Sequence, residues 1–381
     1  MMIVGKRLFS TVLRSMQFVM IGIVCNACTL FDGLSSRSVE QVVYYVTTRA
    51  VALEPDNKEY YGSLRGSLEV GAVSVKLPPD DNPNSFAKTF NYDWANSLFL
   101  SKSKVSKIDL PKSEKLEWVA PLTKADLFEK MNQAMAGQTE KRLLVYIHGF
   151  KRSFGKNVES GARLAYETAY PGPTVVFSWP STNAISGYTA DRGNAEWSTP
   201  YLTRTLLALH QKFPDYKIDL VAHSMGNRVL IDALLGFQEL QPLVSIWPFS
   251  QVVLLAPDID RSIFIENYAA KLAALNSKLT IYVSAEDFPL MASGSFNAYP
   301  RLGDARSGVP VAKGIETIDV SHAITMASGH AYYRKSHQVS HDLYLLLNKN
   351  LPASERETLK KAVNEQGEYW DLLPEPARDA Q

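Results

Sequence analysis

The segment Val221-Ala222-His223-Ser224-Met225-Gly226-Asn227 joins an apolar run at residues 218–222 to a helix-like pattern over residues 228–237. A strand, a sharp turn with a serine at its apex and a following helix form a nucleophile elbow. Such a turn crowds its flanks, so the positions two before and two after the serine must be small. Ala222 and Gly226 occupy these positions. By itself the segment fits equally well a serine that caps the following helix.

Strand and helix patterns alternate on both sides of this segment. Short apolar runs predict buried strands at 143–147, 174–179, 218–222, 250–256, 279–284 and 315–320. Amphipathic stretches predict helices at 158–170, 202–213, 228–237, 263–275 and 340–347. This order specifies an α/β fold, a mostly parallel, doubly wound sheet with flanking helices.

We expect one main domain over residues 40–350, with an N-terminal strand extension at 40–120. Strand patterns at 41–48 and 68–77 define that extension, and a capped helix is expected at 123–136. Residues 351–381 are predicted to form a polar C-terminal tail. Two Gly- and Ser-containing stretches, 183–200 and 288–312, are interpreted as loops that form a lid or rim.

Residues 1–28 read as a signal peptide or lipoprotein leader. Basic residues precede a short apolar run at 18–25 that is too short to span a bilayer comfortably. Cleavage after Ala27 would leave Cys28 first, as in a bacterial lipoprotein, although Cys25 replaces the usual leucine of the cleavage motif. Ordinary cleavage and an uncleaved anchor stay open. We expect an exported protein, periplasmic or lipid-anchored to an envelope membrane.

Composition narrows the possible functions. The formal net charge is +1, so nothing in the sequence predicts a nucleic-acid partner. The only two cysteines are Cys25 and Cys28, which excludes a cysteine nucleophile or a cysteine metal site in the main domain. We expect no metal and no cofactor.

Serine hydrolysis on this fold uses the chain order serine, acid, histidine. Two carboxylates follow strand patterns downstream of Ser224. Asp287 stands at the more usual acid position, and Asp258 at a known variant of it. Asp287 is the predicted acid and Asp258 the alternative. Either carboxylate also suits a turn or a helix cap.

A general base should follow both acids and lie in a loop before the last helix. His330, within Ser328-Gly329-His330-Ala331-Tyr332, meets this requirement. His322 directly follows the last strand pattern and is the alternative. His341 lies within the closing helix and is interpreted as a partly exposed structural residue.

Two backbone amides should bind the oxyanion. One belongs to Met225, which follows the nucleophile at a helix N-terminus. The other is assigned to Phe150, because the strand at 143–147 ends in a His-Gly turn. His148 and His223 precede both acids, so they are interpreted as residues that shape these loops.

Taken together, these motifs resemble a family of bacterial α/β hydrolases of unknown function. The resemblance extends from about Val42 to Leu347. It implies an α/β-hydrolase fold, esterase- or lipase-like activity, Ser224 as nucleophile and His330 as base. Lys151 stands where many relatives carry Asn. The motifs that carry it are Tyr45-Val46-Thr47-Thr48-Arg49, His148-Gly149-Phe150 with Ser153-Phe154, Phe177-Ser178-Trp179-Pro180-Ser181, Tyr188 with Asp191, Ala222-His223-Ser224-Met225-Gly226-Asn227-Arg228, Ala256-Pro257-Asp258-Ile259-Asp260 and Gly329-His330-Ala331-Tyr332.

The sequence therefore predicts a serine hydrolase that cleaves a small-molecule or lipid ester through an acyl-enzyme. Two alternatives stay open. One is a non-catalytic binding module of the cell envelope, and the other is a peptidase or acyltransferase on the same fold. Membrane association through the N-terminus and the oligomeric state are left open.

Overall fold

A computed structural model describes residues 39–55, 59–77, 115–138, 140–241, 247–275, 277–323 and 329–374. The predicted leader at 1–28, with Cys25 and Cys28, lies outside these residues. Within them, no helix is long and apolar enough to cross a membrane.

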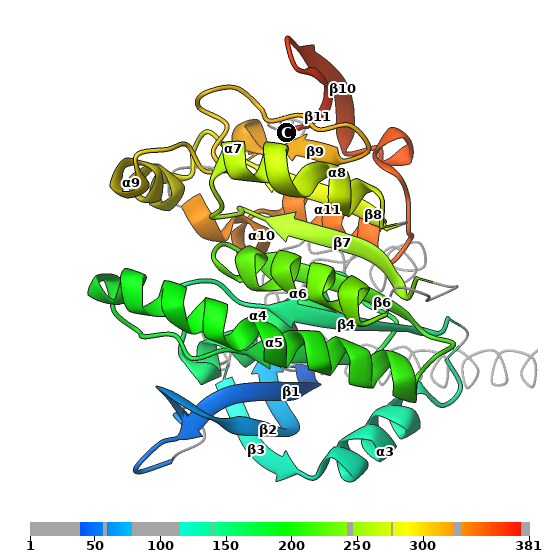
Figure 1. The fold of residues 1–381 in the computed structure, drawn as a ribbon. Coiled ribbons are helices and arrows are strands. Elements are labelled where there is room, and N and C mark those ends of the chain that lie inside the picture. The colour runs from blue at the N-terminus through cyan, green and yellow to red at the C-terminus, as the bar shows by residue number, and fades with distance from the viewer. Residues whose placement is uncertain are drawn as a thin grey trace, which may run out of the picture.

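A single sheet forms the centre of the described chain (Figure 1). Its strands are β1 (Val39–Val51), β2 (Tyr61–Leu77), β3 (Lys115–Leu122), β4 (Arg142–Ile147), β5 (Thr174–Ser178), β6 (Lys217–His223), β7 (Phe249–Leu255), β8 (Lys278–Val283), β9 (Glu316–Asp319), β10 (Leu359–Asn364) and β11 (Gly367–Leu372). They lie in the order β10-β11-β9-β8-β7-β6-β4-β5-β1-β2-β3. The pairs from β11 through to β1 are parallel, and antiparallel pairs occur only at the two edges among the described strands.

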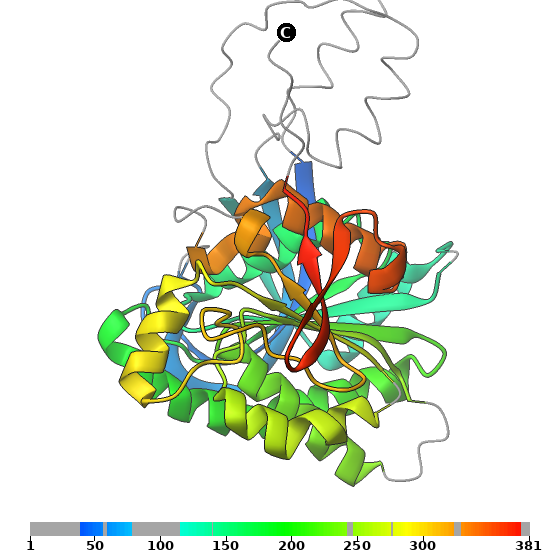
Figure 2. The same ribbon diagram turned by 90° about the horizontal axis from the view of Figure 1, so that it is seen from above.

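Helices cover both faces of the sheet (Figure 2). They are α3 (Lys124–Met135), α4 (Phe154–Glu167), α5 (Tyr188–Lys212), α6 (Gly226–Leu240), α7 (Arg261–Ile263), α8 (Ala269–Ala273), α9 (Phe288–Asn297), α10 (Tyr332–Lys335) and α11 (His337–Leu347). Helices α3, α5, α6 and α8 share one apolar core, and α4, α10 and α11 pack into a second core on the opposite face. The predicted doubly wound architecture is confirmed.

The direction of winding reverses beside β4. From β4 the chain moves to β5 on one side, and it then returns to place β6 on the other side. Loops that leave the carboxyl ends of such strands diverge and open a crevice, which is where open α/β sheets bind ligands. The loop after β4 and the turn after β6 leave the carboxyl edge of the sheet at this point.

Local chemistry explains several element boundaries. The Thr123 side chain accepts a hydrogen bond from the Asp126 amide, which caps α3 as predicted. Beyond the end of that helix Gly137 adopts a left-handed φ of 82°. The N-terminal extension contains one strand more than predicted. The additional strand is β3, which pairs with β2.

The predicted polar tail differs most from the structure. Residues 359–372 form the β10–β11 hairpin, and β11 pairs in parallel with β9. These strands were not predicted because their few buried apolar residues are separated by exposed charged residues. Leu359 and Leu372 are buried, while the lysines and glutamates between them face solvent.

The two stretches predicted as loops also contain helices. Much of 183–200 lies in α5, and α9 occupies residues 288–297. Gly and Ser suggested loops there, yet α9 begins with an Asp287 cap and a proline in its first turn, both favourable at a helix start.

Candidate active site

Ser224 occupies the sharp turn between β6 and α6. Its φ is 53°, a left-handed conformation that costs a non-glycine residue about 1–3 kcal/mol. Its amide bonds the carbonyl oxygen of Leu255 at 2.9 Å, and the Asn227 side chain bonds the Ser224 carbonyl oxygen at 2.9 Å. These bonds hold the strained turn against β7. Ser224 is 3% exposed.

Two glycines allow the loop after β4 to touch this turn. A Cβ on Gly226 would lie 2.2 Å from the His148 carbonyl oxygen, and one on Gly149 would lie 2.6 Å from the Ser224 Cβ. Neither separation is tolerable for heavy atoms that are not bonded. The loop that carries Phe150 therefore lies against the serine only because both positions lack side chains.

Left-handed backbone recurs around the serine. Lys151 after β4 has φ 58°, and Ala256 after β7 has φ 45°. With Ser224 they place strained residues at the carboxyl ends of three neighbouring strands. Such strain concentrates at functional sites, because the surrounding structure must be organised to hold it.

Asp287 and His330 form a hydrogen-bonded pair in which the carboxylate is buried and the imidazole is 22% exposed. The His330 Nδ1 lies 2.8 Å from Oδ2 and 3.1 Å from Oδ1 of Asp287. A carboxylate only accepts, so Nδ1 carries the proton and donates it. Asp287 is fully buried and also caps α9 by accepting from the Leu290 amide at 3.0 Å. Capping and pairing therefore coexist on one carboxylate.

The surroundings of His330 favour its protonated form. Burial alone would lower its pKa, but the charge of Asp287, the hydrogen bond to it and the charge of Asp258 together raise the pKa above its ordinary value. A histidine that is readily protonated beside a carboxylate suits a group that accepts a proton and then returns it.

Asp258 has other partners. Its carboxylate accepts from the Tyr188 hydroxyl at 2.8 Å and from the Ser293 hydroxyl at 2.6 Å. The Arg301 Nε lies 3.9 Å away. Asp258 thus links α5 to α9 beside the site, while Asp287 contacts the histidine.

Several side chains anchor the loop that carries His330. The His223 Nε2 bonds the His330 carbonyl oxygen at 2.8 Å. The Tyr332 hydroxyl donates to the Tyr282 carbonyl at 2.9 Å, and the Tyr333 hydroxyl lies 2.6 Å from that of Tyr146. The loop that carries His330 is therefore held to β6, β8 and β4.

Three other histidines lie outside the Asp287–His330 pair. Burial lowers the pKa of His148 and His223 well below the ordinary value, with further lowering by Arg49 and His330 respectively, so both are neutral near pH 7. His148 stacks on Trp179 with ring centroids 4.6 Å apart. His322 lies exposed in a 3-10 turn, Ser321–Ala323.

The predicted oxyanion donors lie at two converging main-chain segments. Met225 precedes the first turn of α6, where amides lack intrahelical partners and the helix dipole is positive. Phe150 follows Gly149, whose backbone lies against Ser224. The two segments approach the serine from β6 and β4.

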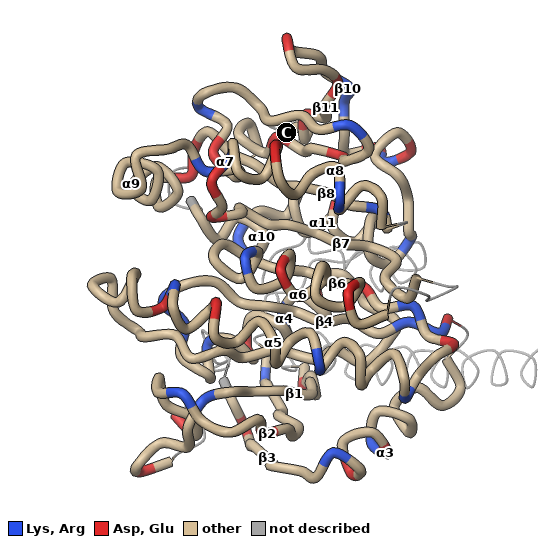
Figure 3. The backbone as a smooth tube through the Cα atoms, viewed as in Figure 1, with Lys and Arg blue, Asp and Glu red and all other residues tan. Residues whose placement is uncertain are grey.

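Apolar surface lies next to these groups. The Phe150 and Tyr188 rings pack edge to face with their centroids 5.4 Å apart. The Tyr188 ring packs in the same way on Phe296 of α9, with centroids 5.7 Å apart. Phe296 is 72% exposed. No residue from 288 to 300 is charged, and α9 carries no charge marking in Figure 3, whereas α3, α4 and α5 carry charges of both signs.

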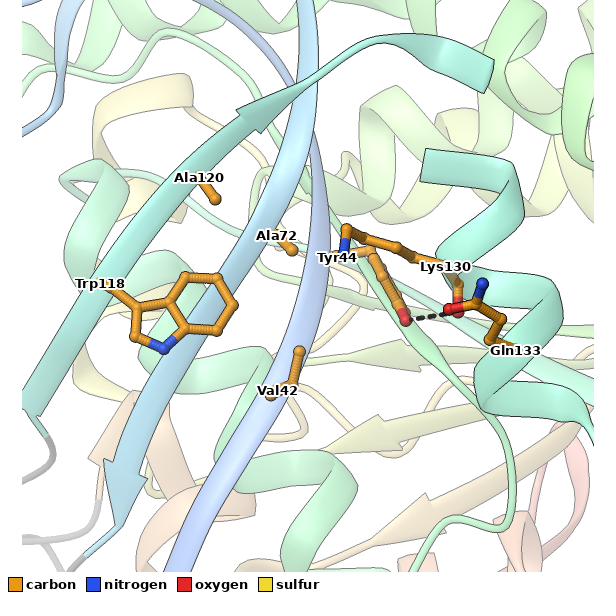
Figure 4. A pocket seen from close by; sticks show the side chains of 7 residues that line it. All are labelled: Val42, Tyr44, Ala72, Trp118, Ala120, Lys130 and Gln133. Carbon is orange, nitrogen blue, oxygen red and sulfur yellow. Dashed lines mark hydrogen bonds between the residues drawn. The ribbon is translucent and has the colours of Figure 1, made fainter. Parts of the chain in front are cut away.

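A shallow pocket of about 260 Å³ lies elsewhere, between the N-terminal strands and α3 (Figure 4). The Tyr44 hydroxyl at its wall bonds the Lys130 carbonyl oxygen at 3.0 Å. None of the candidate catalytic residues lines it. No cluster of three or more His, Cys, Asp or Glu side chains suited to a metal occurs among the residues that the structure describes.

The doubly wound sheet, with its serine turn after β6 and its covering helices, defines an α/β-hydrolase fold. The chain belongs to the family of alpha/beta hydrolases of unknown function (DUF900), which matches residues 123–348. The predicted resemblance is confirmed. An uncharacterized protein of Nostoc sp. is 38% identical over 60 residues, 16% of this chain and 16% of that protein's length.

Solved structures with a similar arrangement are far more distant in sequence. An acetyl xylan esterase is 13% identical, covering 56% of this chain and 99% of its own, with a TM-score of 0.35. The catalytic core of acetyl xylan esterase from Trichoderma reesei is 16% identical, covering 56% and 99%, with a TM-score of 0.33. Phospholipase PlaB from Legionella pneumophila is 13% identical, covering 61% and 67%, with a TM-score of 0.29. Likeness at this level says nothing about activity.

Sequence reasoning gave no role to three residues that shape the site. Arg49, near the end of β1, contacts the loop after β4. Tyr332 and Tyr333 anchor the loop that carries His330. A charged residue near the end of an apolar strand, and two tyrosines shortly after a candidate base, are signals that could have identified them.

Proposed function

We propose that this protein is a serine hydrolase that cleaves carboxylic esters through Ser224, His330 and Asp287. One observation carries the proposal. The predicted base and the predicted acid, 43 residues apart in the chain, share a part-buried hydrogen bond of 2.8 Å beside a strained serine turn. A structural serine cap requires neither the strain nor the pair.

In the proposed reaction the Ser224 hydroxyl attacks the ester carbonyl carbon, and His330 takes the hydroxyl proton. Asp287 keeps Nδ1 protonated and stabilises the imidazolium that forms. The amides of Phe150 and Met225 bind the oxyanion of the tetrahedral intermediate. Collapse releases the alcohol, which receives its proton from His330. Water then repeats these steps on the acyl-enzyme and releases the acid.

The uncharged surface of α9 favours an apolar acyl or alcohol group over a charged one. Phe150, Tyr188 and Phe296 form a continuous line of rings from the proposed oxyanion site to solvent. Apolar substrate groups bind such surfaces by removing hydrocarbon from water.

Covalent labelling tests the nucleophile. A fluorophosphonate probe should label the wild-type protein and fail to label Ser224→Ala. Equal labelling of both proteins, or labelling of neither, contradicts the assignment. Hydrolysis of short p-nitrophenyl esters by the wild type alone then separates an enzyme from a binding module. Release of the acid rather than transfer to an added alcohol or amine separates hydrolysis from acyl transfer.

A further inference from the structure

Arg49 is a buried arginine at the end of β1, in a strand outside the residues that the family match covers. It is 1% exposed. Burial lowers its pKa to about 9, with opposing contributions from Asp191 and Glu59. Burying a guanidinium is costly unless each N–H finds a partner, so its contacts should report what it is there to hold.

The Arg49 guanidinium makes five contacts at hydrogen-bond distance, with at least one from each nitrogen. The partner atoms come from three parts of the chain: β2, β5 with the segment after it, and the loop after β4. They are the Ser178 hydroxyl at 2.9 Å from Nε, the carbonyl oxygens of Gly62 at 3.0 Å and Ser181 at 3.2 Å from Nη1, and the Arg152 carbonyl oxygen at 2.7 Å and His148 Nε2 at 3.4 Å from Nη2.

The two bonds from Nη2 enclose the loop that carries Phe150. One goes to His148 at its start, and the other goes to Arg152 at its end. Both nitrogens of the His148 ring have further partners: Nδ1 lies 2.7 Å from the Gly149 carbonyl oxygen, and Nε2 lies 3.1 Å from the Trp179 carbonyl oxygen. The ring therefore ties the start of the loop to the segment after β5 as well as to Arg49.

A second contact stabilises the same end of the loop. The Arg152 amide donates to the Ser181 hydroxyl at 3.2 Å, and that hydroxyl donates to Asp191 at 2.6 Å. Arg49 bonds the Ser181 carbonyl from the other side. The segment after β5 and the loop after β4 are thus held as one unit around the guanidinium.

We propose that Arg49 is a positioning residue that holds the Phe150 amide where the oxyanion forms. The inference rests on the proposed function and extends it to β1. Preorganised donors act in the transition state only if their position is fixed beforehand. Lysine cannot substitute, because one ammonium cannot reach acceptors that a planar fork spans.

Kinetics of Arg49→Lys and Arg49→Met test the proposal, with Arg65→Lys and Arg65→Met as matched controls. Arg65 lies on β2, is exposed, and bonds Asn194 and the Gly193 carbonyl. Fluorophosphonate titration gives the concentration of competent sites. Per titrated site, we expect kcat to fall about 10- to 100-fold in both Arg49 variants, with KM within about threefold. The Arg65 variants should match the wild type.

A trifluoromethyl ketone provides the readout that a purely structural role would not change. It forms a tetrahedral adduct with the serine, so its affinity should fall in parallel with kcat/KM across the series. A lower fraction of titratable sites with unchanged kcat per site and unchanged ketone affinity would overturn the proposal.

Hydrogen exchange tests the positioning without any turnover. Amides of residues 148–153 should exchange faster in Arg49→Met, while those of β6 and α6 keep their wild-type rates. Unchanged exchange in the loop overturns the inference even for a wild type that hydrolyses nothing. Loss of labelling in the wild type contradicts the proposed function instead, so the two failures are distinguishable.

Discussion

His223 donates a hydrogen bond from Nε2 to the main-chain oxygen of His330, 2.8 Å away, so the residue before the proposed nucleophile holds the loop of the proposed base. The carbonyl can only accept, which places the proton on Nε2. The Nδ1 atom of His223 is buried without a hydrogen-bond partner. This one bond links the turn after β6 to the short segment that precedes α10.

Replacing His223 by Ala should loosen that link. We expect kcat for a short ester to fall about tenfold, because misplacing a catalytic group lowers the rate steeply even when it remains present. His322→Ala is the matched control, since His322 is exposed and was the alternative base. If His322→Ala abolishes turnover and His223→Ala does not change it, the base assignment is wrong.

The two acids are separable by isosteric replacement. Asp287→Asn should lower kcat by about 10³- to 10⁴-fold, because the amide no longer stabilises the imidazolium or selects its tautomer. Asp258→Asn should reduce kcat much less, since its partners are Tyr188 and Ser293. Steady-state kinetics on purified, folded variants decides between them, and the reverse order would assign the acid to Asp258.

The pH profile should report His330. Its raised pKa predicts an acid limb of kcat/KM above the pH expected for an ordinary histidine, near 6.5, because the base must be neutral to accept a proton. Asp258→Asn removes one of the charges that raise this pKa, so the limb should shift to lower pH. A limb that stays in place in this variant contradicts the electrostatic account.

Lys151 should be replaceable with a gain in stability. Its left-handed φ of 58° suits Asn or Gly better than Lys. We expect Lys151→Asn to raise the free energy of unfolding by about 0.5–1 kcal/mol, measured by denaturant titration. Lys156→Asn, on the exposed side of α4, should instead destabilise slightly because Asn is a poor helix former. Equal changes in the free energy of unfolding for the two variants would contradict the explanation based on the left-handed φ of Lys151.

The apolar surface of α9 should set chain-length preference. Phe296→Ser removes an exposed ring from the line that begins at Phe150, so kcat/KM for decanoyl esters should fall about tenfold relative to acetyl esters. Leu240→Ser, at the far end of α6, is the control for loss of an exposed apolar side chain. An unchanged ratio of the two esters in Phe296→Ser would exclude this surface from substrate binding.

The central fold could be predicted because its strands are buried on both faces and read as continuous apolar runs. Ser224, Asp287 and His330 could be selected by chain order and strand-end position. The choice between the two acids depends on partners distant in the chain. Asp258 and Asp287 look equivalent locally, and they differ in their folded contacts, Tyr188 for Asp258 and His330 for Asp287. The β10–β11 hairpin was not predicted from the sequence, because strands buried on one face only carry charged residues on the other face and lack a continuous apolar run.

The residues that match the family, 123–348, lack two buried arginines that the structure supplies from outside them. Arg49 enters from the N-terminal side. Arg356 enters from the C-terminal side, where it bonds Asp342 at 2.6 Å and the Tyr282 hydroxyl at 3.0 Å. A fragment trimmed to the matched residues would retain the buried carboxylate of Asp342 without its cation, and would leave the edge of β9 open to pairing with another chain. We therefore expect the matched segment alone to be less stable than the full described sheet.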